Sequence, residues 1–120
     1  MTEGGYVPVE SATLKTRFHG VYEVGDVATA GVPKAGVFDE GAARVVARNL
    51  IAEWSDADRP DPYDGRGSCY IEFGHGRVGR VDIDFLSGPS KTGVFNAPST
   101  DLVAEKDHFG SSRRARWFGG

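Results

Sequence analysis

Two stretches in the second half of the chain, residues 69–73 and 81–85, alternate between apolar and polar side chains. A period of two is typical of strands with one buried face, so these stretches predict two strands joined by a hairpin at 74–76. Two earlier apolar runs, 5–9 and 21–24, are short and rich in β-branched or aromatic residues, which also favours strands. The pattern therefore predicts a β-rich chain that contains a hairpin.

A different period marks residues 37–54, where apolar residues recur every three or four positions. This spacing predicts a helix with one buried face. The residues expected on that face are Ala43, Ala47, Leu50, Ile51 and Trp54. A second helix is expected over 101–116, with Ser99 or Thr100 as its N-cap. The segment 87–98, rich in Gly, Pro and Ser, predicts a loop.

These elements together predict an α+β fold. The polar segment 56–67, rich in Asp, Pro and Gly, is expected to be an exposed linker between two parts, 1–55 and 68–120. A length of 120 residues allows a modest core, and a net charge of -3 argues against electrostatic steering of nucleic acid. The single cysteine excludes an internal disulfide, and the longest apolar run is too short for a membrane span.

One motif in the predicted hairpin is misleading. Residues 74–79 match the dinucleotide-binding pattern G-x-G-x-x-G and follow a predicted strand. That fingerprint requires a helix whose N-terminus receives the pyrophosphate, whereas the residues after Gly79 keep a period of two. We therefore reject a dinucleotide site here, and the rest of the sequence offers no other phosphate cradle.

Asp26 and Cys69 are the main chemical candidates from position alone. Asp26 directly follows the apolar run 21–24, and ligands of open α/β sheets bind where strands end near helix N-termini. Its carboxylate is thus placed to hold a ligand hydroxyl, unless it only caps a turn. Cys69 is either a small core residue or a reactive thiol. The three histidines lack metal-ligand spacing, so no metal site is expected.

The residues before Gly36 and around Cys69 support a resemblance. Segment 16–26, TRFHGVYEVGD, resembles the second flavin motif of the pyridine nucleotide-disulfide oxidoreductase superfamily, a Thr followed by an apolar strand that ends in Gly-Asp. The loop 32–36, VPKAG, resembles the Val-Pro-Lys-Thr-Gly loop of sulfide:quinone oxidoreductases, with Ala in place of the commoner Thr. Segments 67–74 and 98–119 resemble the C-terminal part of these enzymes and of flavocytochrome c sulfide dehydrogenases.

The resemblance implies FAD as cofactor, with Asp26 on the ribityl chain and the positive end of the helix that starts at Gly36 facing the pyrimidine edge of the flavin. The implied cofactor-binding residues are Gly25, Asp26, Lys34, Ala35 and Gly36. For Lys34 an exposed loop lysine is the alternative. The resemblance also implies that Cys69 is the catalytic cysteine, which pairs with a second cysteine from an N-terminal part. In such enzymes sulfide attacks that disulfide, and the electrons then pass to the flavin.

The resemblance covers nearly the whole chain, but it corresponds to the last third of such an enzyme. It implies the last strand and the flavin-facing helix of a Rossmann-type FAD domain, followed by a β-rich C-terminal domain. The implied partners are N-terminal FAD- and NAD-type domains and a quinone or cytochrome that accepts electrons. We expect the 120-residue chain alone to be inactive and to bind FAD weakly.

The C-terminal residues bear on location, which the resemblance implies to be the cytoplasm or the inner face of a membrane. Arg113, Arg114 and Arg116 precede Trp117 and Phe118. This cluster either contacts anionic lipid or quinone at a peripheral membrane surface, or is a solvated basic end that complements the helix dipole.

Two other functions stay open. The first is a flavin-dependent NAD(P)H dehydrogenase of the same superfamily, in which Cys69 would be structural. The second is a non-catalytic interaction module that folds alone and forms a homodimer through exposed apolar strands. The missing nucleotide fingerprint favours the second.

Overall fold

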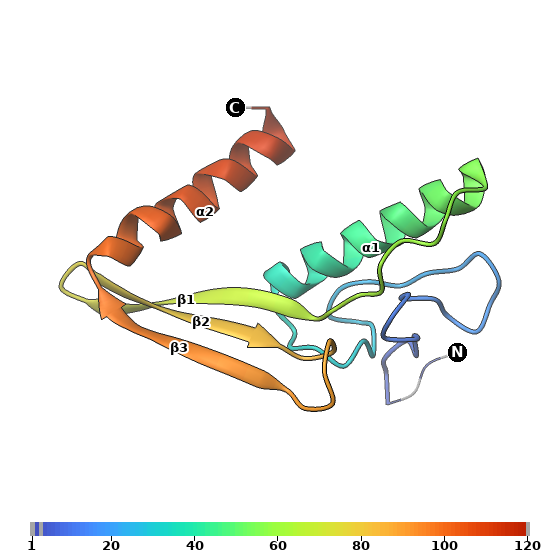
Figure 1. Cartoon of the computed structure of the whole chain (residues 1–120), viewed down its shortest axis with the longest axis horizontal. Coiled ribbons are helices and arrows are strands. Elements are labelled where there is room, and N and C mark those ends of the chain that lie inside the picture. The colour runs from blue at the N-terminus through green and yellow to red at the C-terminus, as the bar shows by residue number, and fades with distance from the viewer. Residues whose placement is uncertain (1, 3, 120) are drawn as a thin grey trace. The chain divides into compact units, whose positions relative to one another are not determined.

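The computed structural model describes residues 2 and 4–119. Five elements follow one another along the chain. They are α1 (Gly36–Ser55), β1 (Arg66–Gly74), β2 (Arg77–Asp84), β3 (Thr92–Ser99) and α2 (Asp101–Phe118), all labelled in Figure 1. Two helices and one antiparallel sheet in the order β1-β2-β3 make this an α+β protein, so the predicted fold class is confirmed.

The hairpin between β1 and β2 has a two-residue turn. His75 and Gly76 both adopt positive φ angles, 52° and 65°, which is the conformation of the type I′ turn that suits a twisted hairpin. Gly79 lies inside β2, and a Cβ atom there would come within 2.9 Å of the Phe73 ring. Side-chain packing in a hairpin therefore explains this glycine, and the misleading dinucleotide pattern contains no helix start.

Strand β3 was not predicted, and the expectation of a loop up to residue 98 is wrong from Thr92 onward. Gly93 and Pro98 both disfavour a strand in isolation. The neighbouring strand overrides this preference, because β2 offers a hydrogen-bonding edge. The Asn96 side-chain amide adds a contact across the pair by donating to the carboxylate of Asp82 at 2.9 Å.

The two strands predicted before residue 30 are also wrong, because each is reduced to an isolated bridge. Val7 pairs with Ala28 in a parallel bridge, and Lys15 pairs with Tyr22 in an antiparallel bridge. A β-prone run becomes a strand only where a neighbouring strand continues the ladder of hydrogen bonds. Within the described part of the chain, that neighbour is present here for one residue pair at a time.

Helix α1 is confirmed to within one residue at each end, but its predicted buried face is wrong. The buried residues are Phe38, Ala42, Val45 and Asn49. The expected stripe points away from the core, and Ile51 and Trp54 are 62% and 82% exposed. Because α1 carries apolar residues on both sides, periodicity alone could not choose between them. Phe38 decides the choice, since it is 1% exposed and packs edge-on against Phe85.

The chain divides into two compact units. The first unit comprises Met1–Gly67 and Ile83–Thr92, and the second comprises Ser68–Asp82 and Gly93–Gly120. The domain limits expected from the sequence, 1–55 and 68–120, stay a prediction.

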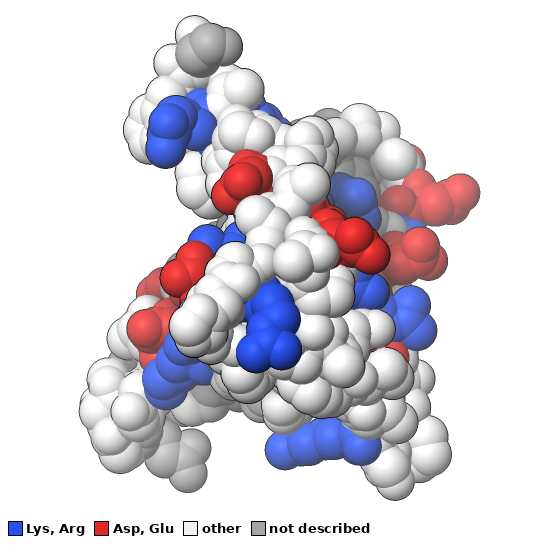
Figure 2. Space-filling view, turned by 90° about the vertical axis from the view of Figure 1, so that its left-hand side faces the viewer, with Lys and Arg blue, Asp and Glu red and all other residues white. Residues whose placement is uncertain are grey.

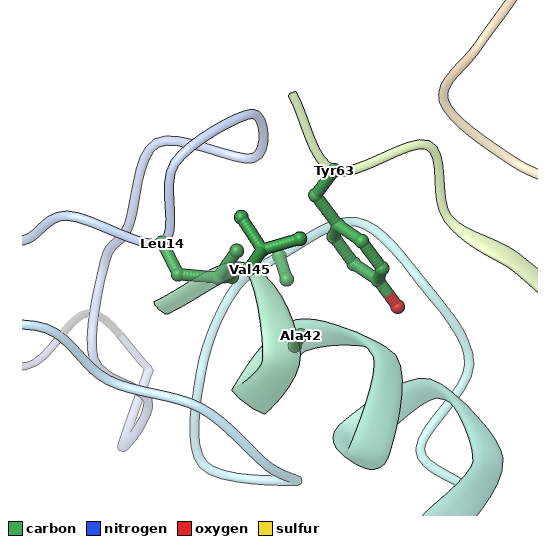
Figure 3. Close-up of a cluster of buried hydrophobic side chains, with 5 residues drawn as sticks. Leu14, Ala42, Val45 and Tyr63 are labelled. Carbon is green, nitrogen blue, oxygen red and sulfur yellow. The ribbon is translucent and has the colours of Figure 1, made fainter. Parts of the chain in front are cut away.

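The core of the first unit gathers side chains from α1 and from the segments on either side of it. The buried cluster consists of Leu14, Ala30, Ala42, Val45 and Tyr63. In Figure 3 the Val45 side chain lies between Leu14 and Tyr63. Tyr63 belongs to the segment expected to be an exposed linker, so that expectation is wrong at this residue. Its ring lies 3.3 Å from the position of a Cβ atom on Gly41, which explains the glycine inside α1.

The second unit packs α2 against one face of its strands. The Tyr70 and Phe109 rings meet edge to face at 5.4 Å, and Tyr70 donates a hydrogen bond to Glu105 at 2.6 Å. Arg80 forms an ion pair with the same Glu105 carboxylate at 2.6 Å. Of the two predicted N-cap candidates of α2, Thr100 is the N-cap residue, and its side chain forms no capping hydrogen bond. The Ser99 hydroxyl, one residue earlier, accepts a hydrogen bond from the backbone N–H of Asp101 at 3.1 Å.

Candidate functional site

The predicted cofactor-binding residues gather in the first unit where the chain enters α1. Gly25 opens a turn in which the Ala28 backbone N–H donates to the Gly25 carbonyl at 3.0 Å. The next loop brings Lys34 back to this turn, because its ammonium group donates to the backbone carbonyl of Asp26. Lys34 also lies over the Tyr6 ring, 4.1 Å from its centroid. One exposed carboxylate and one positive charge therefore share this corner.

Gly25 has a backbone conformation that other residues rarely adopt, with a φ angle of 93°. No atom of the described residues lies within 4 Å of a Cβ atom placed on Gly25, so the glycine is needed for the conformation of the turn and not for space. Gly36, the first residue of α1, has equally open surroundings without a positive φ angle. A ligand could therefore approach the backbone closely at both positions.

The N-terminus of α1 carries no side-chain cap. Its N-cap residue is Ala35, in an extended conformation, and the side chain of alanine has no group that accepts a hydrogen bond. The Ala35 carbonyl accepts bonds from the backbone N–H groups of Phe38 and Asp39, at 2.9 and 3.2 Å. The first N–H groups of the helix point outward with the positive end of the helix dipole, which favours an acceptor or a negative charge there.

Asp39 is a neighbour of this corner that the sequence did not identify as part of a site. Burial raises the pKa of the Asp39 carboxyl, the nearby Asp26 carboxylate raises it further, and Lys34 opposes both effects. Tyr6, the ring beneath Lys34, was also missed, since it was assigned only to a short strand. An acidic residue in the first helical turn was the one available signal for Asp39, and nothing in the sequence relates Tyr6 to Lys34.

The space behind this corner is small. A cavity lined by Gly25, Lys34, Phe38 and Asp39, among others, has a volume of about 10 Å³. That is room for about one water molecule. The first unit thus presents an open surface here and does not enclose a ligand. The groups exposed here are the N–H donors of the helix start, the Lys34 ammonium group and the Asp26 carboxylate.

Two larger hollows flank α1 elsewhere in the first unit, each with a volume of about 320 Å³. One lies near the C-terminal end of the helix and is lined by Lys15, Asn49 and Glu53, together with residues of the adjoining loops. The other is lined by Arg44, Arg48 and residues of the segment before β1. Both have mixed charges on their walls, and neither includes a residue predicted to bind the cofactor.

Cys69 lies on β1 in the second unit, as a free and partly exposed thiol. It alternates with Tyr70, which faces α2, so the thiol lies on the opposite face of the strand. Ile71 and Phe73 share that face and are 42% and 47% exposed. Phe95 of β3 adds a ring 6.3 Å from that of Phe73. Cys69 is therefore part of an accessible apolar sheet face and is not a core residue.

The C-terminal arginines are tied to neighbouring aromatic rings. The Arg113 guanidinium stacks 3.5 Å from the centroid of the Phe109 ring, and Arg116 lies 5.7 Å from the Trp117 ring. Trp117 and Phe118 are themselves 56% and 80% exposed. Positive charge and exposed aromatic surface thus occur together at the end of α2.

Surface charge is mixed in sign. The face presented in Figure 2 carries Lys and Arg side chains interspersed with Asp and Glu. Among residues 2 and 4–119, no three His, Cys, Asp or Glu side chains are grouped as metal ligands. No helix in the described part of the chain combines the length and apolar character needed to cross a bilayer.

A scan against protein-family models found no match to this chain, and neither did a search of curated proteins. The relationship implied by the motifs at Asp26, Lys34 and Cys69 is accordingly a proposal.

Proposed function

We propose that this chain forms the C-terminal part of an FAD-dependent oxidoreductase of the sulfide:quinone type. One observation carries the proposal: an exposed carboxylate at Asp26, an anchored cation at Lys34 and an uncapped helix start after Ala35 occur at one corner of the first unit. This combination suits a ligand with hydroxyl groups next to an electron-accepting ring, which is the arrangement in the flavin half of FAD.

Each residue of the corner has a distinct task in this proposal. Asp26 accepts a hydrogen bond from a ribityl hydroxyl, and the positive φ angle of Gly25 turns the chain so that the carboxylate is exposed. The N–H group of Gly36 donates to the pyrimidine edge of the ring. Lys34 adds a fixed positive charge, since the Asp26 carbonyl and the Tyr6 ring hold its ammonium group. Bound FAD would supply a two-electron carrier whose reduced form gains negative charge near this edge.

Cys69 would be the residue that receives sulfur from sulfide. A partly exposed thiol on an apolar face can react with a second cysteine, whereas a buried thiol could not. The sequence contains one cysteine, so the disulfide that sulfide attacks requires a second thiol from the N-terminal domains of the enzyme. Attack by hydrosulfide forms a persulfide on one sulfur and releases the other as a thiolate, which conserves atoms and electrons.

The proposed partners fit exposed parts of the chain. Within the described residues the run 21–24 forms one isolated β-bridge, between Lys15 and Tyr22, and Val21 in this run is 45% exposed. We assign this run as the place where further strands of an FAD-binding domain join. Trp117 and Phe118, with their adjacent arginines, provide a surface for peripheral contact with the inner face of a membrane, near a quinone or cytochrome acceptor.

The proposal is tested by titrating the purified chain with FAD and with FMN and following flavin fluorescence. The corner contains groups for the ribityl chain and ring but none for the pyrophosphate. We therefore expect weak, saturable binding with equal affinity for FMN and FAD, lost in Asp26→Ala and kept in the control Asp58→Ala. Binding that ignores Asp26, or that requires the adenine half of FAD, would contradict the proposal.

The role of Cys69 distinguishes the two proposed oxidoreductase functions, sulfide oxidation and NAD(P)H dehydrogenation. In the enzyme assembled with its N-terminal domains, sulfide should reduce the flavin in the unmodified protein and fail to do so in Cys69→Ser. If NADH reduces the flavin equally well in both proteins and sulfide in neither, the enzyme is a dehydrogenase and Cys69 is structural.

A further inference from the structure

The outer face of α1 is apolar, and its residues are exposed except for Leu50, which is half-buried. The residues on it are those expected from the sequence to be buried, namely Ala43, Ala47, Leu50, Ile51 and Trp54. Trp54 is 82% exposed and Ile51 is 62% exposed, while the opposite side of α1 is fully engaged with the core of the first unit. A helix that is apolar on both sides is usually buried on both sides. An exposed apolar stripe of this kind marks an interaction surface.

The spacing of four of these residues defines a seam for a second helix. Positions 43, 47, 50 and 54 are separated by four, three and four residues, which is the spacing of the two core positions in a coiled coil. These four residues lie roughly one above another along the helix, so a partner helix would contact all of them. The stripe therefore suits a helix, with its own row of side chains, better than a flat surface.

Side-chain size increases along the seam from its N-terminal to its C-terminal half, which favours a particular partner helix and orientation. Ala43 and Ala47 occupy its N-terminal half, whereas Leu50 and Trp54 occupy its C-terminal half. A second copy in antiparallel orientation places Trp54 of one chain over Ala43 of the other, and Leu50 over Ala47. Large residues then fill the space left by small ones at every level. A parallel pair would oppose two Trp54 side chains and leave a gap between the alanines.

The charges along the same span favour the same orientation. Between residues 43 and 54 the charged residues are Arg44, Arg48 and Glu53. A parallel pair sets arginine beside arginine, whereas an antiparallel pair sets the arginine-bearing half of one helix at the level of Glu53 in the other, where Glu53 is paired with Lys15 of its own chain. The helix dipoles are also opposed in the antiparallel pair, which places unlike helix ends together.

We propose that the outer face of α1 is a homodimer interface, in which two copies of the chain pair antiparallel about a two-fold axis between Ala47 and Leu50. The contact is isologous, since the same residues take part on both sides. One helix face per chain is small for a protein interface, so the dimer dissociates on dilution. This inference rests on α1 alone and does not depend on the flavin site.

Sedimentation of the full chain over a wide range of concentrations tests the proposal. We expect a monomer at low concentration and a dimer at high concentration. Trp54→Glu should abolish the dimer, because it places a charge in the seam. Trp117→Glu is the matched control, since it removes another exposed tryptophan from the second unit, and it should leave the dimer unchanged. Circular dichroism establishes that each variant is folded.

A charge-swap pair tests the orientation. Ala47→Glu alone should give a monomer, and adding Leu50→Lys should restore the dimer, because residue 47 of one chain faces residue 50 of the other only when the helices are antiparallel. A chain that stays monomeric at every concentration would overturn the proposal and leave another domain as the cover of this face. Equal loss of the dimer in Trp54→Glu and Trp117→Glu would overturn it as well.

Discussion

The ammonium group of Lys34 donates a hydrogen bond to the backbone carbonyl of Asp26, which joins the turn after Gly25 to the loop that enters α1. The bond uses the main chain of Asp26, so its carboxylate stays exposed and available. The same ammonium group lies over the Tyr6 ring. Three segments that are separate in sequence thus meet at the Lys34 side chain, and the Val7–Ala28 bridge joins two of them through the backbone.

Replacing Lys34 by Met should weaken flavin binding without unfolding the chain. The alkyl stem of Met keeps contact with the Tyr6 ring, while the positive charge near the helix start is lost. An attraction between exposed opposite charges contributes about 0.2–1 kcal/mol, so we expect the dissociation constant for FMN to rise by roughly 1.5- to 5-fold. The matched control is Lys91→Met, because Lys91 also lies over an aromatic ring, 5.1 Å from that of Phe85. An equal loss in both variants would contradict a role for Lys34.

Tyr63 should make the first unit sensitive to alkaline pH. Its hydroxyl donates to the Phe38 carbonyl at 2.9 Å, and burial raises the pKa of Tyr63 to about 12. Because the folded state favours the neutral phenol, this stabilisation is complete below the ordinary pKa of 10.0 and is lost as pH rises toward 12. Urea unfolding across this pH range should show the loss in the unmodified chain. Tyr63→Phe should show a flatter profile, and an identical profile would contradict the assignment.

Two glycine substitutions should change stability in opposite directions. Gly65 has a φ angle of 63°, and a Cβ atom on it would lie 2.8 Å from Leu86. Gly65→Ala should therefore lower the free energy of unfolding by roughly 1–3 kcal/mol through overpacking.

Gly110 lies within α2, and no atom of the described residues lies within 4 Å of a Cβ atom placed on it. Gly110→Ala should raise stability by up to about 1 kcal/mol. Urea denaturation measures both, and a stabilising Gly65→Ala would show that the segment before β1 is not packed as described.

Acidification should loosen the second unit. Hydrogen bonds from Tyr70 and from Arg80 lower the pKa of Glu105 below its ordinary value of 4.5. A carboxylate whose pKa is lowered on folding stabilises the protein above its ordinary pKa, and that contribution is lost as pH falls below it. Glu105→Gln should reduce the dependence of the urea midpoint on pH below 4.5, whereas Asp58→Asn should not. Parallel pH profiles for the unmodified chain and Glu105→Gln would contradict the role of this carboxylate.

The local sequence was sufficient to predict the elements whose pattern is set by residues close together in the chain. Both helices and the hairpin turn at His75 and Gly76 were predicted because a period of 3.6, or a pair of residues that accept positive φ, acts within a few positions. Strand β3 and the buried side of α1 were not predicted, because each is determined by a contact with residues that are distant in sequence. β2 selects β3, and the pocket around Phe38 selects the inward face of α1.

The candidate site shows the same division. Gly25, Asp26 and Lys34 were proposed because the short segments that contain them resemble flavoprotein motifs. Tyr6 and Asp39 join them only through the folded chain. Tertiary contacts of this kind leave no periodic signal in the sequence.

The most direct test of the flavin site is to follow backbone amide resonances while FMN is added to the isotope-labelled chain. We expect saturable shifts at Gly25, Asp26 and Gly36, with a smaller effect at the buried Phe38, and none at Asp58 in the polar segment before β1. Asp26→Ala should remove these shifts while the rest of the spectrum is unchanged. Saturable shifts located elsewhere on the chain, or none at any concentration of FMN, would contradict the central claim that this corner holds a flavin.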